Sequence, residues 1–135
     1  MTALAADRQT PRRSAHQFSL PCAAAVRHYA GSIVCLNASG LAVKGATSTT
    51  LKTVGVAQEN VDNTNGAAGD LQVPVERGCW RFANSASTDQ ITLADYGSTC
   101  YVVDDQTVAK TNGTNTRIAA GIVRDVDAAG VWVEF

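Results

Sequence analysis

Charged side chains are scarce in this sequence. Asp, Glu, Lys and Arg make up 17% of its 135 residues, whereas about 25% is usual for soluble domains. The surface must therefore be built largely from Thr, Ser, Asn, Ala and Gly, a composition that favours close contact with other proteins. The chain has the mass of one domain. A fold of this size buries about two-thirds of the surface of the unfolded chain, which is enough for a core without metal or disulfide support.

Long apolar runs are also lacking. No stretch of about 18 apolar residues occurs, so we expect no membrane span and no membrane partner. The apolar stretch from Phe18 to Val26 is interrupted by Ser19 and Pro21. A signal peptide needs a continuous apolar segment of roughly 7–15 residues, so we expect no export by that route.

Residues that carry out nucleophilic chemistry are few. The cysteines at positions 22, 35, 79 and 100 form no Cys-x-x-Cys pair, and we interpret them as small apolar residues in a reducing compartment. Cys22 lies near His28, the minimum for a thiol nucleophile, but no orienting Asn or Asp is evident. Nucleophile-elbow, Walker and dinucleotide-binding patterns are absent. We therefore predict a protein that is not an enzyme and has no cofactor.

One loop, Asp62–Gly66, has the oxygen-rich composition of a calcium site. It lacks the glutamate expected six residues after its glycine, where Gln72 stands. Its Asn65-Gly66 pair is explained as a turn between strands. We therefore predict no metal site in this loop.

The charges are unevenly distributed along the chain. Residues 1–30 contain four arginines against one aspartate, whereas residues 31–135 contain seven basic and eleven acidic side chains. An acidic body lacks the basic face that nucleic-acid binding requires, so we expect no nucleic-acid partner. The segment Arg77–Phe82 alternates polar and aromatic residues, with both arginines on one face. A half-buried strand explains that alternation better than a platform for single-stranded nucleic acid.

Residues 1–20 show neither helical nor strand periodicity. We predict that they form an extended N-terminal arm able to order on a partner, with Pro21 at the junction to a β-rich domain over residues 21–135. The candidate partner-binding residues are the large apolar and the basic side chains of this arm. They are Leu4, Arg8, Arg12, Arg13, Phe18 and Leu20.

From about Ala30 onward the sequence has the pattern of short strands joined by turns. Turn signals such as Asn65-Gly66 and Asn112-Gly113 separate short runs rich in β-branched residues. A short helix fits Gln90–Asp95, and the remainder is predicted to be all-β. The predicted strands are Ser32–Leu36, Leu41–Val43, Val54–Ala57, Leu71–Val75, Thr99–Val103, Ala119–Val123 and Val131–Phe135.

An internal repeat is the most informative feature of the sequence. A shift of 66 residues superimposes two copies that share the order glycine, strand, turn, short strand, loop, strand. The identical pairs are Gly31-Ser32 with Gly97-Ser98, Lys44 with Lys110, and Gly55 with Gly121. Each copy closes with a further strand, which we place at Gly69–Val73 in the first copy and Gly130–Glu134 in the second.

The repeat predicts two similar half-units, each too small for its own core. We expect them to close face to face into one small β-barrel or sandwich. The matched glycines at positions 55 and 121 suggest bends or bulges where strands curl. The fold class is therefore predicted to be all-β, a small barrel or sandwich of two half-units with an extended N-terminal arm.

The pattern of glycines and β-branched residues is similar to that of a known family. The segments that carry it are Tyr29–Val34, Val54–Ala57, Ala120–Val126 and Gly130–Val133. Their layout resembles that of tailed-bacteriophage capsid decoration proteins, also called head cement proteins. The resemblance covers roughly residues 29–135, and the arm has no matching motif.

The resemblance implies a structural virion protein on the outer surface of the phage capsid, made in the host cytoplasm. Its partners would be the major capsid protein and further copies of itself, as a homotrimer or a dimer. Proteins of this kind lie over junctions between capsomers. They tie neighbouring major capsid subunits together and stabilise the head against the pressure of packaged DNA.

A carbohydrate-binding or adhesion module of a phage fibre or tail is the alternative hypothesis. Trp80, Trp132 and Tyr101 would then form an exposed surface on which sugar rings stack. Core packing is the more usual role for such rings, and it favours the capsid hypothesis.

Overall fold

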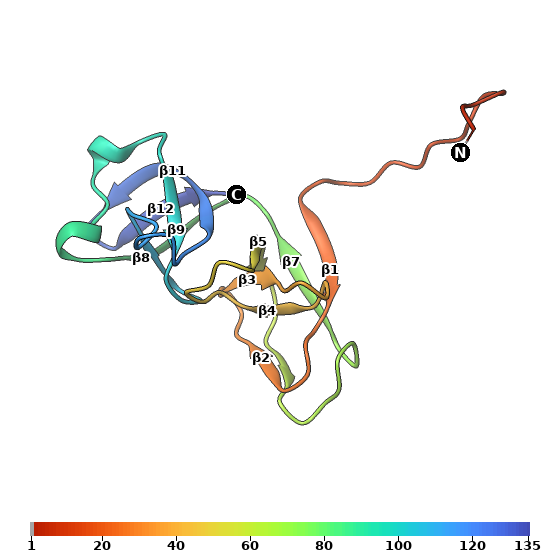
Figure 1. Ribbon diagram of the computed structural model, residues 1–135, viewed down its shortest axis with the longest axis horizontal. Coiled ribbons are helices and arrows are strands. Elements are labelled where there is room, and N and C mark those ends of the chain that lie inside the picture. Colours follow the sequence, from red (N-terminus) through yellow and green to blue (C-terminus); the bar gives the residue numbers. More distant parts are fainter. Residues whose placement is uncertain (1) are drawn as a thin grey trace.

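The computed structural model describes residues 2–135, so Met1, the first residue of the predicted arm, lies outside the described residues. The chain forms two β lobes and a projecting N-terminal segment (Figure 1). The prediction of an all-β fold is confirmed. Within residues 2–135, no helix has the length and apolar character needed to cross a membrane.

The elements divide into two consecutive sets, one for each lobe. The first lobe contains β1 (Gln17–Pro21), β2 (Val26–His28), β3 (Ile33–Leu36), β4 (Ala42–Lys44), β5 (Lys52–Ala57), β6 (Val61–Asn63) and β7 (Gln72–Glu76). The second lobe contains β8 (Cys79–Asn84), β9 (Thr99–Val102), β10 (Thr107–Ala109), β11 (Ala119–Asp127) and β12 (Gly130–Glu134). Two single-turn 3-10 helices, η1 (Ser87–Asp89) and η2 (Leu93–Asp95), take the place of the short helix predicted at Gln90–Asp95.

The two lobes have the same strand order. The main sheet of the first lobe runs β1-β7-β5-β3-β4, and the second lobe runs β8-β12-β11-β9-β10 before β10 closes on β8 to complete a five-stranded barrel. The first lobe adds a separate two-stranded sheet of β2 and β6. The internal repeat predicted from the sequence is therefore a repeat of strand topology.

The pairing of residues repeats as well. Val34 lies opposite Gly55 in the first lobe, and Cys100 lies opposite Gly121 in the second, each pair 66 residues from its counterpart. In both lobes the register shifts by one residue immediately before the glycine. The bulge predicted at each glycine is thus confirmed. A side chain at Gly55 would place its Cβ 2.7 Å from the carbonyl oxygen of Glu76, so glycine is required by close backbone approach.

The closing strand of the repeat was placed wrongly in the first copy. Val56 pairs with Glu76 in the first lobe, and its counterpart Ile122 pairs with Glu134 in the second. The strand that matches Gly130–Glu134 is therefore β7, not Gly69–Val73. The chain between the paired residues Ile122 and Glu134 is eight residues shorter than the chain between Val56 and Glu76, and this difference displaced the match by three residues.

We expected the two half-units to close face to face into one barrel or sandwich. Each half-unit instead encloses its own core. The first core consists of Cys22, Val34, Ala42, Ala57, Val61, Val73 and Val75. The second contains Phe82, Ile91, Cys100, Val102, Val108, Ala120, Val123, Val131 and Val133. The halves are large enough for separate interiors because each has an additional strand, β1 or β8, that the repeat did not include.

The second core also includes three residues of the first lobe, Ile33, Cys35 and Val56. They project from the outer face of β3 and β5 and are at most 2% exposed. The contact between lobes is further fixed by the Ile33 amide, which donates to the carbonyl oxygen of Asp105 at 2.8 Å. Thr47 Oγ1 donates to the carbonyl oxygen of Val103 at 2.9 Å. The lobes are therefore packed through an apolar interface rather than joined by a linker alone.

All four cysteines are free, and three of them are buried as predicted. Burial raises the pKa of the Cys35 and Cys100 thiols to about 11. Cys79 differs from the prediction because it lies on the outer face of β8 and is exposed.

Candidate partner-binding surface

The N-terminal segment projects away from both lobes (Figure 1). Every side chain from residue 2 to residue 16 is exposed, and Leu4 is 75% exposed. In the described chain, Arg8, Arg12 and Arg13 take part in no ion pair. These four predicted binding residues therefore lie on an exposed segment, and its three arginines have no salt-bridge partner within the described residues.

The arm ends earlier than predicted. Residues 17–20 belong to β1, which pairs with β7 over its full length, from Gln17 opposite Glu76 to Pro21 opposite Gln72. Phe18 and Leu20 are thus strand residues, and both are half-buried. The exposed arm that precedes β1 is residues 2–16, and β1 begins four residues before the boundary predicted at Pro21.

Phe18 and Leu20 line a hollow at one end of the first lobe. We call this hollow, about 300 Å³ in volume, the first-lobe mouth. Its lining residues are Phe18, Leu20, Thr53, Val54, Val75 and Arg77. The mouth opens because β5 pairs with β7 only at Val56 and Ala57, so the first residues of β5 have no partner strand on that side.

The corresponding place in the second lobe is occupied by aromatic side chains. The strand registers match Phe18 with Trp80, Leu20 with Phe82, and Arg77 with Phe135. The rings of Phe82 and Phe135 lie 5.6 Å apart between centroids, and Trp80 packs against the same core. Smaller and polar residues at the matching positions leave the first-lobe mouth open.

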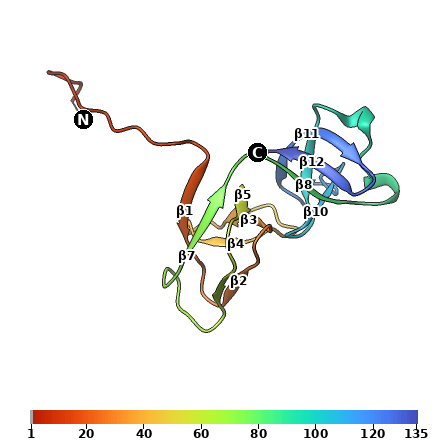
Figure 2. The same cartoon turned by 180° about the vertical axis from the view of Figure 1, so that it is seen from behind.

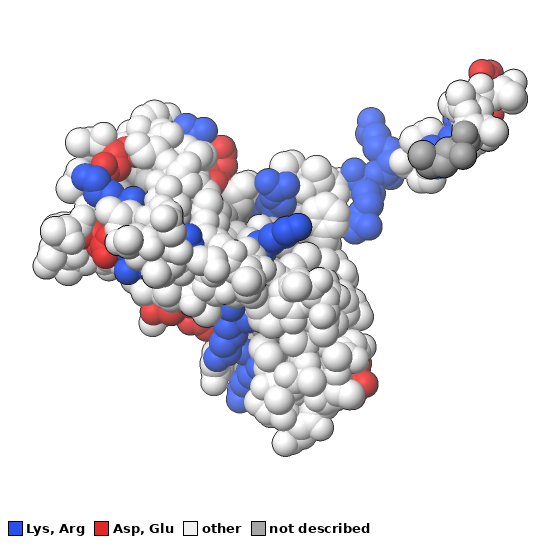
Figure 3. Space-filling model, in the orientation of Figure 1, with Lys and Arg blue, Asp and Glu red and all other residues white. Residues whose placement is uncertain are grey.

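The mouth has a basic rim. The guanidinium of Arg13 lies 4.7 Å from the centroid of the Phe18 ring, a cation–π contact that joins the base of the arm to the mouth. Arg77 lines the mouth and is exposed. Glu76 lies on the outer face of β7, because successive strand residues point to opposite faces and its neighbour Val75 points inward. Figure 3 shows basic side chains gathered along the arm and between the lobes.

Cys22 and His28, the candidate nucleophile and base, are both buried and each lies within reach of a backbone carbonyl oxygen. Cys22 Sγ donates to the carbonyl oxygen of Val26 at 3.7 Å, and His28 Nε2 lies 3.3 Å from the carbonyl oxygen of Ala42. Both side chains are fully buried. Burial raises the pKa of the Cys22 thiol and lowers the pKa of His28. The ring is therefore neutral and the thiol protonated at neutral pH.

In the Asp62–Gly66 loop, which has a calcium-like composition, side-chain oxygens accept hydrogen bonds from the loop itself. Asp62 Oδ1 accepts hydrogen bonds from the amide and the hydroxyl of Thr64, and these bonds lower the pKa of the Asp62 carboxyl. Asn63 turns inward and donates to the carbonyl oxygens of Ala23 and Ala67. Nowhere in residues 2–135 do three or more His, Cys, Asp or Glu side chains gather as metal ligands do.

The aromatic residues of the alternative hypothesis do not form one surface. Trp80 lies opposite Val133, and Trp132 lies opposite Arg81. Neighbouring positions of paired strands alternate between faces, so Trp80 points toward the core and Trp132 points outward. Trp132 Nε1 donates to Asp127 Oδ2 at 3.0 Å, and Arg81 lies over its ring.

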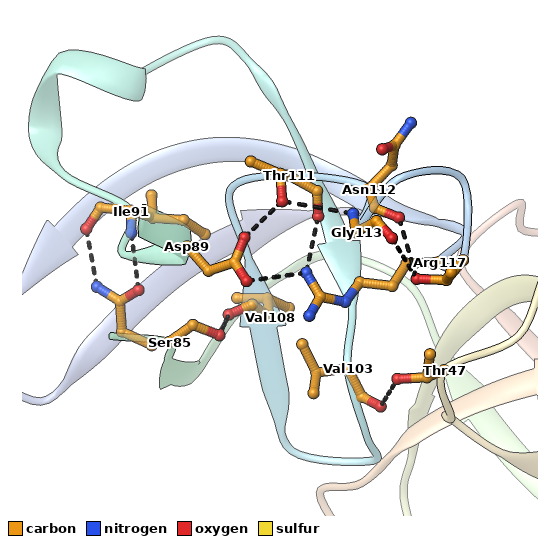
Figure 4. A network of polar contacts seen from close by, with 12 residues as sticks. Thr47, Ser85, Asp89, Ile91, Val103, Val108, Thr111, Asn112, Gly113 and Arg117 are labelled. Carbon is orange, nitrogen blue, oxygen red and sulfur yellow. Dashed lines mark hydrogen bonds and ion pairs between the residues drawn. The ribbon is translucent and has the colours of Figure 1, made fainter. Parts of the chain in front are cut away.

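A polar network that sequence reasoning missed closes the far side of the second lobe (Figure 4). Arg117 Nη1 lies 3.2 Å from Asp89 Oδ2 and donates to the carbonyl oxygen of Thr111 at 3.1 Å. The Thr111 hydroxyl donates to the same carboxylate, and it is the main cause of the lowered pKa of Asp89. These contacts join η1 to the loop after β10, so the network stabilises two loops of the barrel.

No protein-family model, curated protein or solved structure matches this chain.

Proposed function

We propose that this chain is a structural virion protein that binds the outer surface of a phage capsid and cements neighbouring major capsid subunits. The observation that carries the proposal is the exposed basic arm of residues 2–16, fixed at its base beside an open apolar mouth. The resemblance of residues 29–135 to capsid decoration proteins supports the same function.

The arm provides reach and the lobes provide a rigid anchor. Fifteen extended residues span about 50 Å, enough to reach from one capsid subunit to its neighbour. Ordering the arm costs about 1 kcal/mol or more per residue, so it needs anchoring contacts. Leu4 supplies an apolar anchor, and Arg8, Arg12 and Arg13 supply charged ones.

Cementing follows from several modest contacts made at once. The arm and the body of one copy bind different capsid subunits, so the second contact forms at a high effective concentration. Self-association as a homotrimer multiplies the number of contacts in the same way. Exposed arginines on the arm make binding weaken as the salt concentration rises, because salt screens exposed charges.

The test is co-sedimentation of the purified chain with undecorated phage heads. We expect binding that saturates at a fixed ratio to the major capsid protein and raises the temperature at which the heads break open. A variant lacking residues 2–16 keeps β1 intact, and we expect it to bind at least about tenfold more weakly. Absence of binding by the intact chain to any head would contradict the proposal.

A further inference from the structure

We infer that the first-lobe mouth is a docking site for one aromatic side chain carried by an acidic segment of the partner protein. This inference rests on the proposed function only for the identity of the partner. Its physical basis is the comparison of one place in the two lobes, which are built alike but filled differently.

The shape of the occupant follows from the second lobe. There Phe135 packs on Phe82 and closes the end of the core. The matching pair in the first lobe is Arg77 and Leu20, which leaves the half-buried Leu20 and Val54 in contact with solvent. A single aromatic ring entering the mouth would make the contacts that Phe135 makes in the second lobe, and burying it is favourable because apolar surface leaves water.

The charge of the occupant follows from the rim. Arg77 lies in the wall of the mouth, and Arg13 lies over Phe18 at its edge. The nearest acidic residue along β7, Glu76, faces the outside of the sheet. A segment with acidic residues on either side of its aromatic residue is therefore attracted and correctly placed.

The same rim argues against the arm of a second copy as the occupant. The arm contains Arg8, Arg12 and Arg13 but only one acidic residue, Asp7, and no aromatic residue before Phe18. A basic arm approaching a basic rim is repelled, and Leu4 is the one large aliphatic side chain it could insert. The observations therefore favour a foreign acidic segment.

The probe is a blocked five-residue peptide, Asp-Glu-Phe-Glu-Asp, titrated into the full chain. Methyl NMR signals of Leu20, Val54 and Val75 report on the mouth. We expect saturable shifts confined to these residues, and at least about tenfold weaker binding when the central Phe of the peptide is Ala. Absence of shifts at the mouth overturns the inference.

Two variants test the shape and the charge separately. Arg77→Phe reproduces the plug of the second lobe, so we expect loss of peptide binding with the thermal unfolding midpoint kept or raised. Arg77→Glu leaves the mouth open but reverses its charge. We expect this variant to bind the acidic peptide at least about tenfold more weakly and to bind the basic peptide Lys-Lys-Phe-Lys-Lys more tightly than the unmodified chain does. Arg124→Phe, the same change on the exposed face of the second lobe, is the matched control and should bind as the unmodified chain does.

Three further results would overturn the inference. They are unchanged peptide binding by Arg77→Phe, equal binding of the acidic and basic peptides by the unmodified chain, and tighter binding of a peptide copy of residues 2–16. Co-sedimentation with heads separates this inference from the proposed function. If heads bind the chain and Arg77→Phe equally well, the docking site is wrong and the capsid role stands. If the acidic peptide binds at the mouth but no head binds the chain, the docking site stands and the capsid role is wrong.

Discussion

The two lobes share their strand order and the bulge that precedes Gly55 and Gly121, yet only the second forms a closed barrel. One residue explains the difference. The amide of Ala83 donates to the carbonyl oxygen of Gln106 at 2.8 Å and joins β8 to β10. The matching residue in the first lobe is Pro21, which has no amide hydrogen to donate. Only a single bridge, between Cys22 and Ala42, remains there, whereas Figure 2 shows β8 and β10 side by side in the second lobe.

The outer faces of the lobes differ as well. Ile33 and Val56 of the first lobe are buried beneath the second lobe, whereas their counterparts Thr99 and Ile122 are exposed or half-buried. The second lobe thus covers the face of the first lobe that carries Ile33 and Val56, whereas the matching face of the second lobe is not covered. Two units with the same strand order therefore differ in closure and in the cover over their outer faces, and part of the difference lies at single positions such as Pro21 and Ala83.

The largest expected effect comes from a residue that both lobes require. Gly121→Ala would drive a Cβ into the carbonyl oxygen of Glu134, and we expect a loss of about 4 kcal/mol in the free energy of unfolding. Gly55→Ala should be comparably harmful. Gly40→Ala is the control, because its Cβ would contact nothing within 4 Å and only its φ of +75° is unfavourable, a cost of about 1 kcal/mol. Urea unfolding measures all three, and a fully stable Gly121→Ala protein would contradict the shared bulge.

The next effect separates the covered face from the uncovered one. Ile33→Ala removes a fully buried side chain from the contact between lobes, and we expect a loss of about 3 kcal/mol. Thr99→Ala, the same position in the second lobe, is exposed and should change stability by less than about 0.5 kcal/mol. Equal losses for the two variants would show that the lobes are not packed as described.

Exchanging the residue that closes the barrel should have a smaller effect. Ala83→Pro removes the hydrogen bond to Gln106 and leaves that carbonyl without its partner, and we expect a loss of about 2 kcal/mol. Pro21→Ala supplies the missing amide in the first lobe. Hydrogen exchange should then show protection of the new amide, with a stability change below about 1 kcal/mol because the unfolded chain gains freedom. An unprotected amide at residue 21 would weaken the explanation from proline.

The smallest effect is a pH dependence confined to the first lobe. His28 is buried and lies on β2, part of the two-stranded sheet that the first lobe has in addition to the shared strands. Burial lowers the pKa of His28 in the folded state, with Lys44 and Asp105 nearby acting in opposite directions. The folded protein therefore binds fewer protons than the unfolded chain below the ordinary pKa of 6.5. Its stability contribution is complete above that pH and is lost as the pH falls.

Urea midpoints at pH 7.5 and pH 5 measure this loss. His28→Leu should flatten the dependence, whereas His16→Gln, a change in the exposed arm, should leave it in place. A His28→Leu protein that still loses the same stability at pH 5 would show that another group is responsible.

The sequence predicted the all-β class, most strands and the repeat, because glycines and alternating β-branched residues mark these features locally. It did not predict β1, β2 or β6. Two of these have only three residues, too few for a periodic pattern, and Gln17–Pro21 ends in a proline that suggested a junction. The alternation of Phe18 and Leu20 with polar neighbours was the available signal for β1.

The mouth was beyond prediction for a different reason. Loops of unequal length separate the strands of the two copies, so Phe18 matches Trp80 at an offset of 62 residues and Val75 matches Val133 at 58. A single shift of 66 cannot align them. Recognising that Arg77 stands where Phe135 plugs the second lobe therefore required the registers of the folded strands.

We propose that the open first lobe and its arm face the capsid, while the closed second lobe supports them from the solvent side. Electron cryomicroscopy of undecorated phage heads saturated with the chain measures this orientation. We expect two-lobed density on the outer surface, with the first-lobe mouth and residues 2–16 against capsid subunits and the second lobe toward solvent. Density in which the second lobe contacts the capsid and the first-lobe mouth faces solvent would rule out this orientation.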